Sequence, residues 1–397
     1  MWKFPRKHLW LCWASNKMRT SVYLHIPFCP AKCHYCDFLS FSVTGSALSV
    51  HRYLQLLEKE MALRGAELKA GGHVVETLYI GGGTPTVLEE AQLEYLLLAC
   101  RRHLPLNDAE WTVEANPGTI TAQKAKLLAS YGVNRISLGI QDINDCRLAL
   151  LGRTHTAAQA RQAFFLCREH FPTVSVDIMT GLPKQSAEDV EEAVSEVCRW
   201  QPDHISLYGL KVEEGTELAS LVEKGKVELP AEEDVLSMML AGKDRLLSHG
   251  YEHYEIANFA RPGKVCRHNL TYWQNRPYLG LGLGAHSFWQ DKRFHNTVHW
   301  QGYRQGLEQN SLPLQEETFV TRRQMMEDTM MLGLRLMQGV YFAEFQARFA
   351  CDLRQVFAKE IALLKKQGLI VCDAERIYLS SSGYPLANIV FAQFLTV

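Results

Sequence analysis

The chain has 397 residues, of which 47% are hydrophobic and 21% are charged, and its formal net charge is −1. This composition is typical of a globular protein that is long enough for more than one hydrophobic core. The balanced charge provides no basic surface, so we expect no nucleic-acid partner. No apolar run approaches the roughly 20 residues that a membrane span needs.

Residues 1–20 form a leader in which basic side chains alternate with Trp2, Trp10 and Trp13. The leader has neither a sustained apolar region nor a clear cleavage site, which argues against a secretory signal. A basic, tryptophan-rich leader could make a peripheral contact with an anionic membrane surface. The alternative is a disordered extension, with Met18 as the working start of the chain.

Eleven cysteines are present, and three of them lie within eight residues, at Cys29, Cys33 and Cys36. The other eight are scattered without a regular spacing. An odd number of scattered cysteines does not resemble a secreted disulfide framework. The pattern instead indicates a reducing compartment such as the cytoplasm, with buried thiols and one metal site.

Short β-branched runs alternate with amphipathic stretches as far as about residue 210. The expected strands cover residues 22–26, 77–80, 111–115, 135–140, 174–179 and 204–208. The expected helices between them cover residues 50–63, 88–101, 122–130, 157–170 and 187–200. This order predicts an α/β fold with a parallel sheet. Because six units are too few for an eightfold barrel, we expect a partial (β/α)6 barrel.

The regular alternation stops after the sixth unit. A helix is expected over residues 232–248, and a glycine-rich run covers residues 280–284. From about residue 315 the pattern is mainly helical and ends in a short hairpin, which is typical of a winged-helix-like domain. We therefore expect a core over residues 21–215, a barrel extension over 216–312 and a C-terminal domain over 313–397.

The three clustered cysteines directly follow the first expected strand, where α/β folds place their active sites. The spacing C-x3-C-x2-C allows three thiolates to bind one cubane iron–sulfur cluster. The fourth iron would then have no cysteine, and an open coordination position indicates ligand binding. The alternative is structural zinc, which requires four ligands and for which only His34 is close by.

Polar residues follow the carboxyl ends of the other strands as well. They include Gly82, Gly83 and Thr84 after the second strand, Glu114 near the end of the third, Gln141 after the fourth, Asp177 in the fifth and Arg153 in a loop. Each could be a cap or a solvated loop residue, but together they form a ring on the face that bears the cysteines.

The motif H-I-P-F-C-x3-C-x2-C resembles the radical-SAM superfamily, and within it the branch of oxygen-independent coproporphyrinogen III oxidases and HemW heme chaperones. The resemblance covers nearly all of the chain except the leader. It implies a radical-SAM barrel that carries a [4Fe-4S] cluster on the three cysteines and binds S-adenosylmethionine (SAM). Gly82, Gly83 and Thr84 match the SAM loop of this branch. The remaining matches are Glu114 toward the SAM ammonium, Arg153 toward its carboxylate, Gln141 and Asp177 toward the ribose, and Tyr23 and Tyr35 near the cofactor.

Two features distinguish the oxidases from the chaperones. Phe38 stands where the oxidase pattern has a further cysteine, and no phenylalanine can replace a thiol in redox chemistry or hydrogen bonding. The sequence H-N-L-T-Y-W matches the chaperone motif H-N-x-x-Y-W and provides four heme-binding candidates: His268, Asn269, Tyr272 and Trp273. An imidazole can ligate heme iron and aromatic rings can pack on the macrocycle. His286 is a second ligand candidate, and a buried His–Asn cap is the structural alternative.

The sequence therefore predicts a heme chaperone that binds heme and transfers it to apo-hemoproteins, with respiratory hemoproteins implied by the resemblance. The cluster and SAM would have a supporting or gating role, and no residue is assigned to catalysis. The alternative is a coproporphyrinogen III oxidase that decarboxylates its substrate oxidatively.

Overall fold

The computed structural model describes residues 18–43 and 49–395. Most of the expected leader lies outside these ranges. The first strand begins at Met18 rather than at Val22, so it includes the last three residues of the expected leader. Within the described ranges, no helix is both long and apolar enough to cross a membrane.

Six parallel strands form the centre of the molecule, and each of them contains one of the strands expected from the sequence. They are β1 (Met18–Ile26), β4 (His73–Gly82), β5 (Leu106–Ala115), β6 (Arg135–Gln141), β7 (Thr173–Thr180) and β8 (His204–Gly209). They pair in this order along the sheet. The expected partial (β/α)6 barrel is confirmed.

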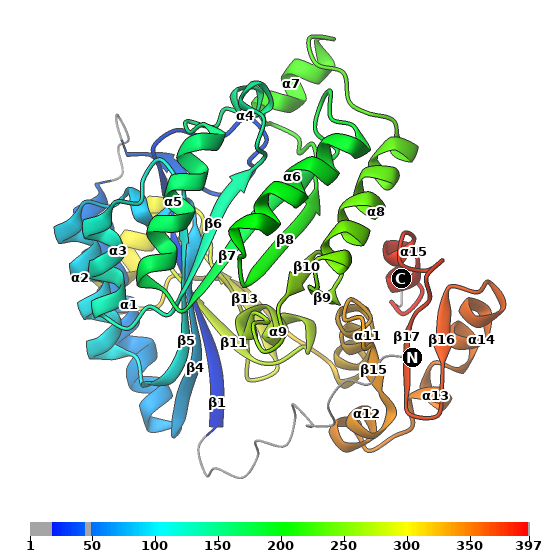
Figure 1. The fold of residues 1–397 in the computed structure, drawn as a ribbon. Coiled ribbons are helices and arrows are strands. Elements are labelled where there is room, and N and C mark those ends of the chain that lie inside the picture. The colour runs from blue at the N-terminus through cyan, green and yellow to red at the C-terminus, as the bar shows by residue number, and fades with distance from the viewer. Residues whose placement is uncertain (1–17, 44–48, 396–397) are drawn as a thin grey trace.

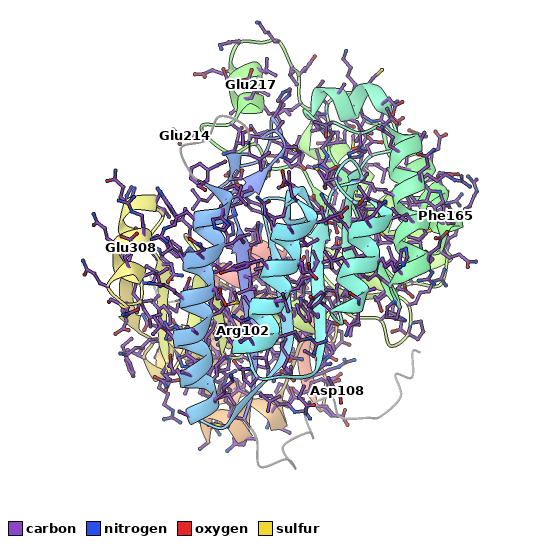
Figure 2. The ribbon with its side chains drawn as sticks, turned by 90° about the vertical axis from the view of Figure 1, so that its left-hand side faces the viewer. Arg102, Asp108, Phe165, Glu214, Glu217 and Glu308 are labelled. Atoms are coloured by element: carbon purple, nitrogen blue, oxygen red, sulfur yellow. The ribbon has the colours of Figure 1, made fainter. Side chains whose placement is uncertain are left out.

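Helices cover the outer face of this sheet, and Figures 1 and 2 show them side by side. They are α1 (Val50–Ala70), α2 (Glu90–His103), α3 (Ala122–Ser130), α4 (Asp145–Leu150), α5 (Ala157–His170) and α6 (Ala187–Trp200). Side-chain caps fix several starts: the hydroxyls of Thr121, Thr156 and Ser186 accept hydrogen bonds from the first turns of α3, α5 and α6. These three helices have the bounds that the sequence predicts.

Further strands extend the sheet on both sides. On one edge β11 (Tyr278–Leu281) runs parallel to β1, followed by the antiparallel strands β12 (His286–Trp289), β13 (Lys292–Asn296) and β14 (Leu314–Phe319). On the other edge β8 pairs with β10 (Asn258–Ala260), which pairs with β9 (Glu252–Glu255). The two edges do not pair with each other within the described residues, so the barrel stays open.

Four helices accompany these added strands. They are α7 (Glu217–Glu223), α8 (Glu232–Ser248), α9 (Arg267–Trp273) and α10 (Trp300–Glu308). Helix α10 lies beside α1, where Arg52 forms a 2.6 Å ion pair with Glu308, which Figure 2 labels. The extension is thereby attached to the first helix of the barrel.

The C-terminal region is helical with a small sheet. Its elements are α11 (Arg322–Gly333), β15 (Val340–Tyr341), α12 (Phe342–Phe349), α13 (Leu353–Val356), α14 (Ala358–Lys366), β16 (Ile370–Cys372), β17 (Arg376–Leu379) and α15 (Ala387–Ala392). The three strands pair in the order β15-β17-β16. Their core includes Met330, Phe357 and Ile377, and it also takes in Phe288 of β12. The region therefore packs against the extended sheet (Figure 1).

Candidate functional site

The three clustered cysteines lie in a loop that leaves the carboxyl end of β1. A short parallel pair closes the base of this loop, where β2 (Phe28–Cys29) pairs with β3 (Phe41–Ser42). Cys33 and Cys36 lie between these strands, and the Cys36 amide donates to the Cys33 carbonyl at 3.2 Å. All three thiols are free and partly exposed. The loop therefore offers three thiols at the mouth of the barrel.

This donor set suits a cluster better than a single ion. No three His, Cys, Asp or Glu side chains in the described ranges converge on one metal-ion position. In a cubane cluster each thiolate binds its own iron, so the sulfurs surround the cluster and need not converge. Arg153 adds a cation, because its Nη1 donates to Cys33 Sγ at 3.4 Å while its Nε is buried without a partner.

His34 does not complete a four-ligand zinc site in this structure. Its Nδ1 contacts the Leu150 carbonyl at 2.8 Å, and its amide donates to the Leu151 carbonyl at 2.9 Å. The ring also packs against Gly152, where an added Cβ would lie 2.7 Å from it. His34 thus fastens the cysteine loop to the end of α4.

The glycine-rich turn after β4 forms backbone hydrogen bonds with the start of the cysteine loop. The amides of Gly83 and Thr84 donate to the carbonyls of Ile26 at 2.9 Å and Phe28 at 2.7 Å. Pro85 opens a short 3-10 helix, η1 (Pro85–Val87), as its position after Thr84 suggests. The Thr84 hydroxyl does not cap that helix and instead lies 3.7 Å from Cys29 Sγ. This turn therefore positions the first cysteine.

Glu114 lies inside the barrel beside the same turn. It accepts hydrogen bonds from Tyr79 Oη at 2.8 Å and from the Gly82 amide at 3.0 Å. Gly81 leaves room for the carboxylate, since an added Cβ would lie 2.6 Å from Glu114 Oε2. Burial raises the pKa of Glu114 to about 7, with nearby Asp177 adding to the shift. A cationic ligand would favour the carboxylate form.

Gln141, Arg153 and Asp177 lie around the same interior space. Gln141 accepts from Tyr208 Oη at 2.8 Å and has a left-handed backbone, with φ of 68°. The Arg153 Nη2 donates to the Gly139 carbonyl at 2.5 Å. Burial raises the pKa of Asp177 to about 6, although hydrogen bonds from serine hydroxyls and the nearby Arg153 charge oppose this shift.

The two predicted tyrosines flank this space. Tyr23 stacks with Tyr79 at a centroid distance of 6.2 Å and hydrogen-bonds His25 Nδ1 at 3.1 Å. Tyr35 packs with Leu151 and Met179, and Arg153 and Cys33 lie close to it. The structure thus brings the cysteines, the glycine turn and the polar ring predicted from the sequence to one end of the barrel.

The predicted heme motif lies in α9, which packs against β4 and β5 away from the cysteine loop. His268 is 1% exposed and stacks on Tyr79 at a centroid distance of 5.0 Å. Its Nδ1 hydrogen-bonds Thr77 Oγ1 at 2.7 Å and its Nε2 hydrogen-bonds Tyr272 Oη at 2.8 Å. Burial lowers the pKa of His268 to about 3. Ligation of heme by His268 stays a prediction, and it would require one of these bonds to open.

The other residues of the motif also contact the protein interior. The rings of Tyr272 and Tyr278 pack edge to face with centroids 4.7 Å apart. The Arg335 guanidinium carbon lies 4.2 Å from the centroid of the Trp273 ring. Asn269 is only half buried. The structural alternative considered for this motif, a buried cap beside an aromatic pair, describes these contacts.

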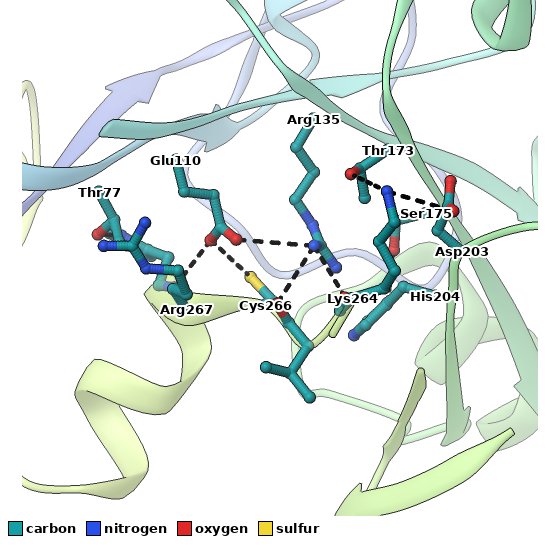
Figure 3. A network of polar contacts seen from close by, with 12 residues as sticks. Thr77, Glu110, Arg135, Thr173, Ser175, Asp203, His204, Lys264, Cys266 and Arg267 are labelled. Atoms are coloured by element: carbon teal, nitrogen blue, oxygen red, sulfur yellow. Dashed lines mark hydrogen bonds and ion pairs between the residues drawn. The ribbon is translucent and has the colours of Figure 1, made fainter. Parts of the chain in front are cut away.

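A polar network connects α9 to the floor of the barrel (Figure 3). Glu110 accepts from the His268 amide at 3.0 Å and faces Arg135 at 3.7 Å. Arg135 in turn donates to the Lys264 carbonyl at 3.1 Å. The segment before α9 and the helix itself therefore close the barrel at the end opposite the cysteines.

Three side chains of the site do not stand out in the sequence. Tyr79 and Tyr208 hold Glu114 and Gln141, and Ser137 lies 3.4 Å from an Asp177 oxygen. Each occupies an inward position of its strand, where alternate residues face the barrel interior. A polar residue at such a position is the signal that could have identified them.

Two segments of the chain match known protein families. Residues 23–197 match the Radical SAM superfamily, and residues 320–386 match the HemN C-terminal domain. The chain is 37% identical to heme chaperone HemW of Bacillus subtilis (strain 168), covering 94% of this chain and 99% of that protein. It is 36% identical to heme chaperone HemW of Lactococcus lactis subsp. lactis (strain IL1403), covering 94% of this chain and 97% of that protein.

Two further similarities extend this result. The mitochondrial radical S-adenosyl methionine domain-containing protein 1 of Bos taurus is 33% identical, covering 96% of this chain and 89% of that protein. Among solved structures, the radical-SAM coproporphyrinogen III oxidase (HemN) from Escherichia coli superposes with a TM-score of 0.83 at 24% identity, over 95% of this chain and 90% of that chain. This structural likeness shows the shared fold.

Proposed function

Because the chain belongs to the HemW heme chaperone family of radical-SAM proteins, we propose that it binds heme and transfers it to apo-hemoproteins. The observation that carries this proposal is identity of more than a third along nearly the whole length of HemW proteins. Phe38 adds support, because it stands where the oxidase pattern has a further cysteine, and its side chain is 59% exposed beside the cysteine loop.

The barrel mouth fits a [4Fe-4S] cluster and SAM as the resident groups. A reduced cluster supplies one electron to the sulfonium of SAM when both are bound. Cys29, Cys33 and Cys36 would hold three irons. Glu114 would accept the SAM ammonium and Arg153 would bind its carboxylate, as the unpartnered Arg153 Nε permits.

The remaining polar groups would complete the SAM site. Gln141 and Asp177 would hydrogen-bond the ribose hydroxyls, while Tyr23 and Tyr35 exclude water from its sides. Gly82, Gly83 and Thr84 would form the wall next to the cysteine loop. In this proposal His268, Asn269, Tyr272 and Trp273 act on heme. The buried hydrogen bond between His268 and Tyr272 holds this motif in place.

We place the chain in the cytoplasm, where scattered free thiols persist. A contact of the basic leader with an anionic membrane would bring it close to respiratory acceptors. We also propose that the radical-SAM core ends near residue 215, that the barrel extension follows it, and that the C-terminal domain starts near residue 313.

Two assays on the anaerobically reconstituted chain separate chaperone from oxidase. Titration with hemin should produce a Soret band that saturates at a fixed ratio of heme to chain. Incubation with SAM, a reductant and coproporphyrinogen III should produce no substantial protoporphyrinogen. Decarboxylation in the second assay without a complex in the first would establish the oxidase instead.

A further inference from the structure

A histidine pair, of which His286 is exposed and His295 is half-buried, lies at the open end of the β12–β13 hairpin. His286 and His295 are cross-strand partners, and their rings stack with centroids 4.9 Å apart at an interplanar angle of 27°. The His295 Nδ1 lies 2.9 Å from the Asn296 carbonyl, which can only accept, so Nδ1 carries the proton. His295 is thereby fixed, with Nε2 3.7 Å from Glu316 Oε2.

His286 differs from His268 in its availability. Its side chain is exposed, and its ring has no hydrogen-bond partner among the described residues. Burial and the neighbouring His295 lower the pKa of His286, which keeps a nitrogen lone pair free at neutral pH. A neutral, solvent-accessible imidazole is what an axial position on heme iron requires.

The position of the pair relates it to both parts of the proposed site. Alternation along β12 places His286 on the same face as Phe288, which enters the C-terminal core. The Tyr278 partner of Phe288 meets Tyr272 of the proposed heme motif edge to face. An aromatic strip thus runs along this face from the exposed histidine to α9.

The turn before His286 contacts the cysteine loop. An added Cβ on Gly284 would lie 2.9 Å from Leu39 Cδ2 and 3.4 Å from Val298 Cγ1. Val298 is 42% exposed and Phe38, next to Leu39, is 59% exposed. Exposed apolar side chains at this rim provide contacts for a flat macrocycle, and the rim is the one that carries the cluster cysteines.

We infer that His286 is the axial ligand of heme at the barrel rim and that His295 positions its ring by stacking. This inference rests on the proposed heme-binding function and specifies its site. Heme would then lie at the barrel rim beside the cysteine loop, accessible to an acceptor protein. The motif that includes His268 would act on heme through Tyr272 and Tyr278 rather than by ligation from His268.

The test is a hemin titration of the full chain and four variants, read by the Soret and visible bands. His286→Ala should lose the imidazole-ligated spectrum and weaken hemin binding by about tenfold or more, equivalent to at least about 1.4 kcal/mol. Added imidazole should restore the spectrum. His295→Ala should weaken binding less. His249→Ala, a half-buried histidine at the far end of α8, is the control and should bind as the unaltered chain does.

His268→Ala is the fourth variant, and circular dichroism checks that each variant is folded. The ligand assignment is overturned if His286→Ala retains the original spectrum and affinity, or if folded His268→Ala alone loses the imidazole ligand. If the unaltered chain forms no hemin complex, the proposed heme-binding function itself fails. The two failures are therefore distinguishable.

Discussion

At the scale of single residues, the site contains acidic side chains whose pKa values are raised by burial. Glu114 is the clearest case, because two neutral donors and a nearby acid surround it inside the barrel. Such a carboxyl is neutral in part at neutral pH and becomes fully charged when a cation pairs with it. The affinity for a cationic ligand should therefore depend on the protonation state of Glu114.

We expect SAM to bind more tightly as the pH rises from 6 to about 7, below the range in which an α-amino group loses its proton. The carboxylate form of Glu114 pairs with the SAM ammonium, and its pKa of about 7 means that low pH removes this form. Asp177, with a pKa of about 6, contributes in the lower part of this range. Equilibrium dialysis of SAM against the cluster-loaded chain measures the effect.

The matched variant is Glu114→Gln, which keeps the size of the side chain and removes its charge. Its SAM affinity should be lower at about pH 7 and should depend less on pH between 6 and 7. An unchanged slope in this variant would show that another group receives the ammonium.

A second residue-level prediction concerns Gly83, which must approach the cysteine loop closely. An added Cβ would lie 2.5 Å from the Phe28 carbonyl oxygen and 2.8 Å from that of Ile26. Since both atoms belong to the backbone, Gly83→Ala should destabilise the loop by about 1–3 kcal/mol and reduce the iron bound per chain. Gly118→Ala is the control, with its nearest atom 3.6 Å away. Equal iron content in both variants would refute this role.

At the scale of elements, the sequence predicted what local patterns determine. The bounds of α3, α5 and α6 follow from their caps, and the six core strands follow from β-branched runs. The sequence indicated strand-like pieces without bounds where β11 to β13 lie, and a mainly helical pattern from about residue 315, where β14 lies. These edge strands are short and depend on pairing with β1 and with one another. Their positions come from tertiary contacts rather than from local sequence.

One buried acid connects several of these edge elements. Glu60 of α1 accepts from the Gly282 amide at 2.9 Å, from Asn296 Nδ2 at 2.6 Å and from Tyr303 Oη at 2.6 Å. Its side chain thus ties α1 to the β11–β12 turn, to β13 and to α10. The sequence alone did not reveal this role, since one glutamate in an amphipathic helix looks like a solvated residue.

We therefore predict that Glu60→Ala destabilises the chain by about 3 kcal/mol, because three buried donors lose their acceptor. Thermal unfolding of the purified chain measures this loss. The exposed neighbour Lys59 provides the control, and Lys59→Ala should change the midpoint little. Equal midpoints for the two variants would contradict the proposed role of Glu60.

At the scale of the whole molecule, the C-terminal region contacts the loop that follows α9. Arg348 of α12 donates to the Gln274 carbonyl at 3.2 Å and to the Asn275 carbonyl at 2.7 Å. The polar ring at the carboxyl ends of the strands could be predicted from sequence, because parallel topology dictates where strand ends meet. The hydrogen bonding of both His268 ring nitrogens could not, because Thr77 reaches His268 only through the packing of α9 against β4, although Tyr272 is four residues along the same helix.

Removal of the Arg348 contact should loosen the C-terminal region without unfolding the barrel. In Arg348→Ala, amides of α9 and α12 should exchange hydrogen faster, while those of β5 and β6 keep their protection. Arg354→Ala, which removes an exposed arginine paired with Asp352, is the control. No change in α9 exchange would show that other contacts dock this region.

The central claim is that this chain delivers heme. The most direct measurement loads the full chain with hemin, adds an apo-hemoprotein and follows the Soret band as heme changes hosts. We predict that the band of the donor complex decays while the band of the acceptor rises by the same number of heme equivalents. Retention of all heme by the chain, or a transfer rate equal to that of hemin bound to serum albumin, would contradict the claim.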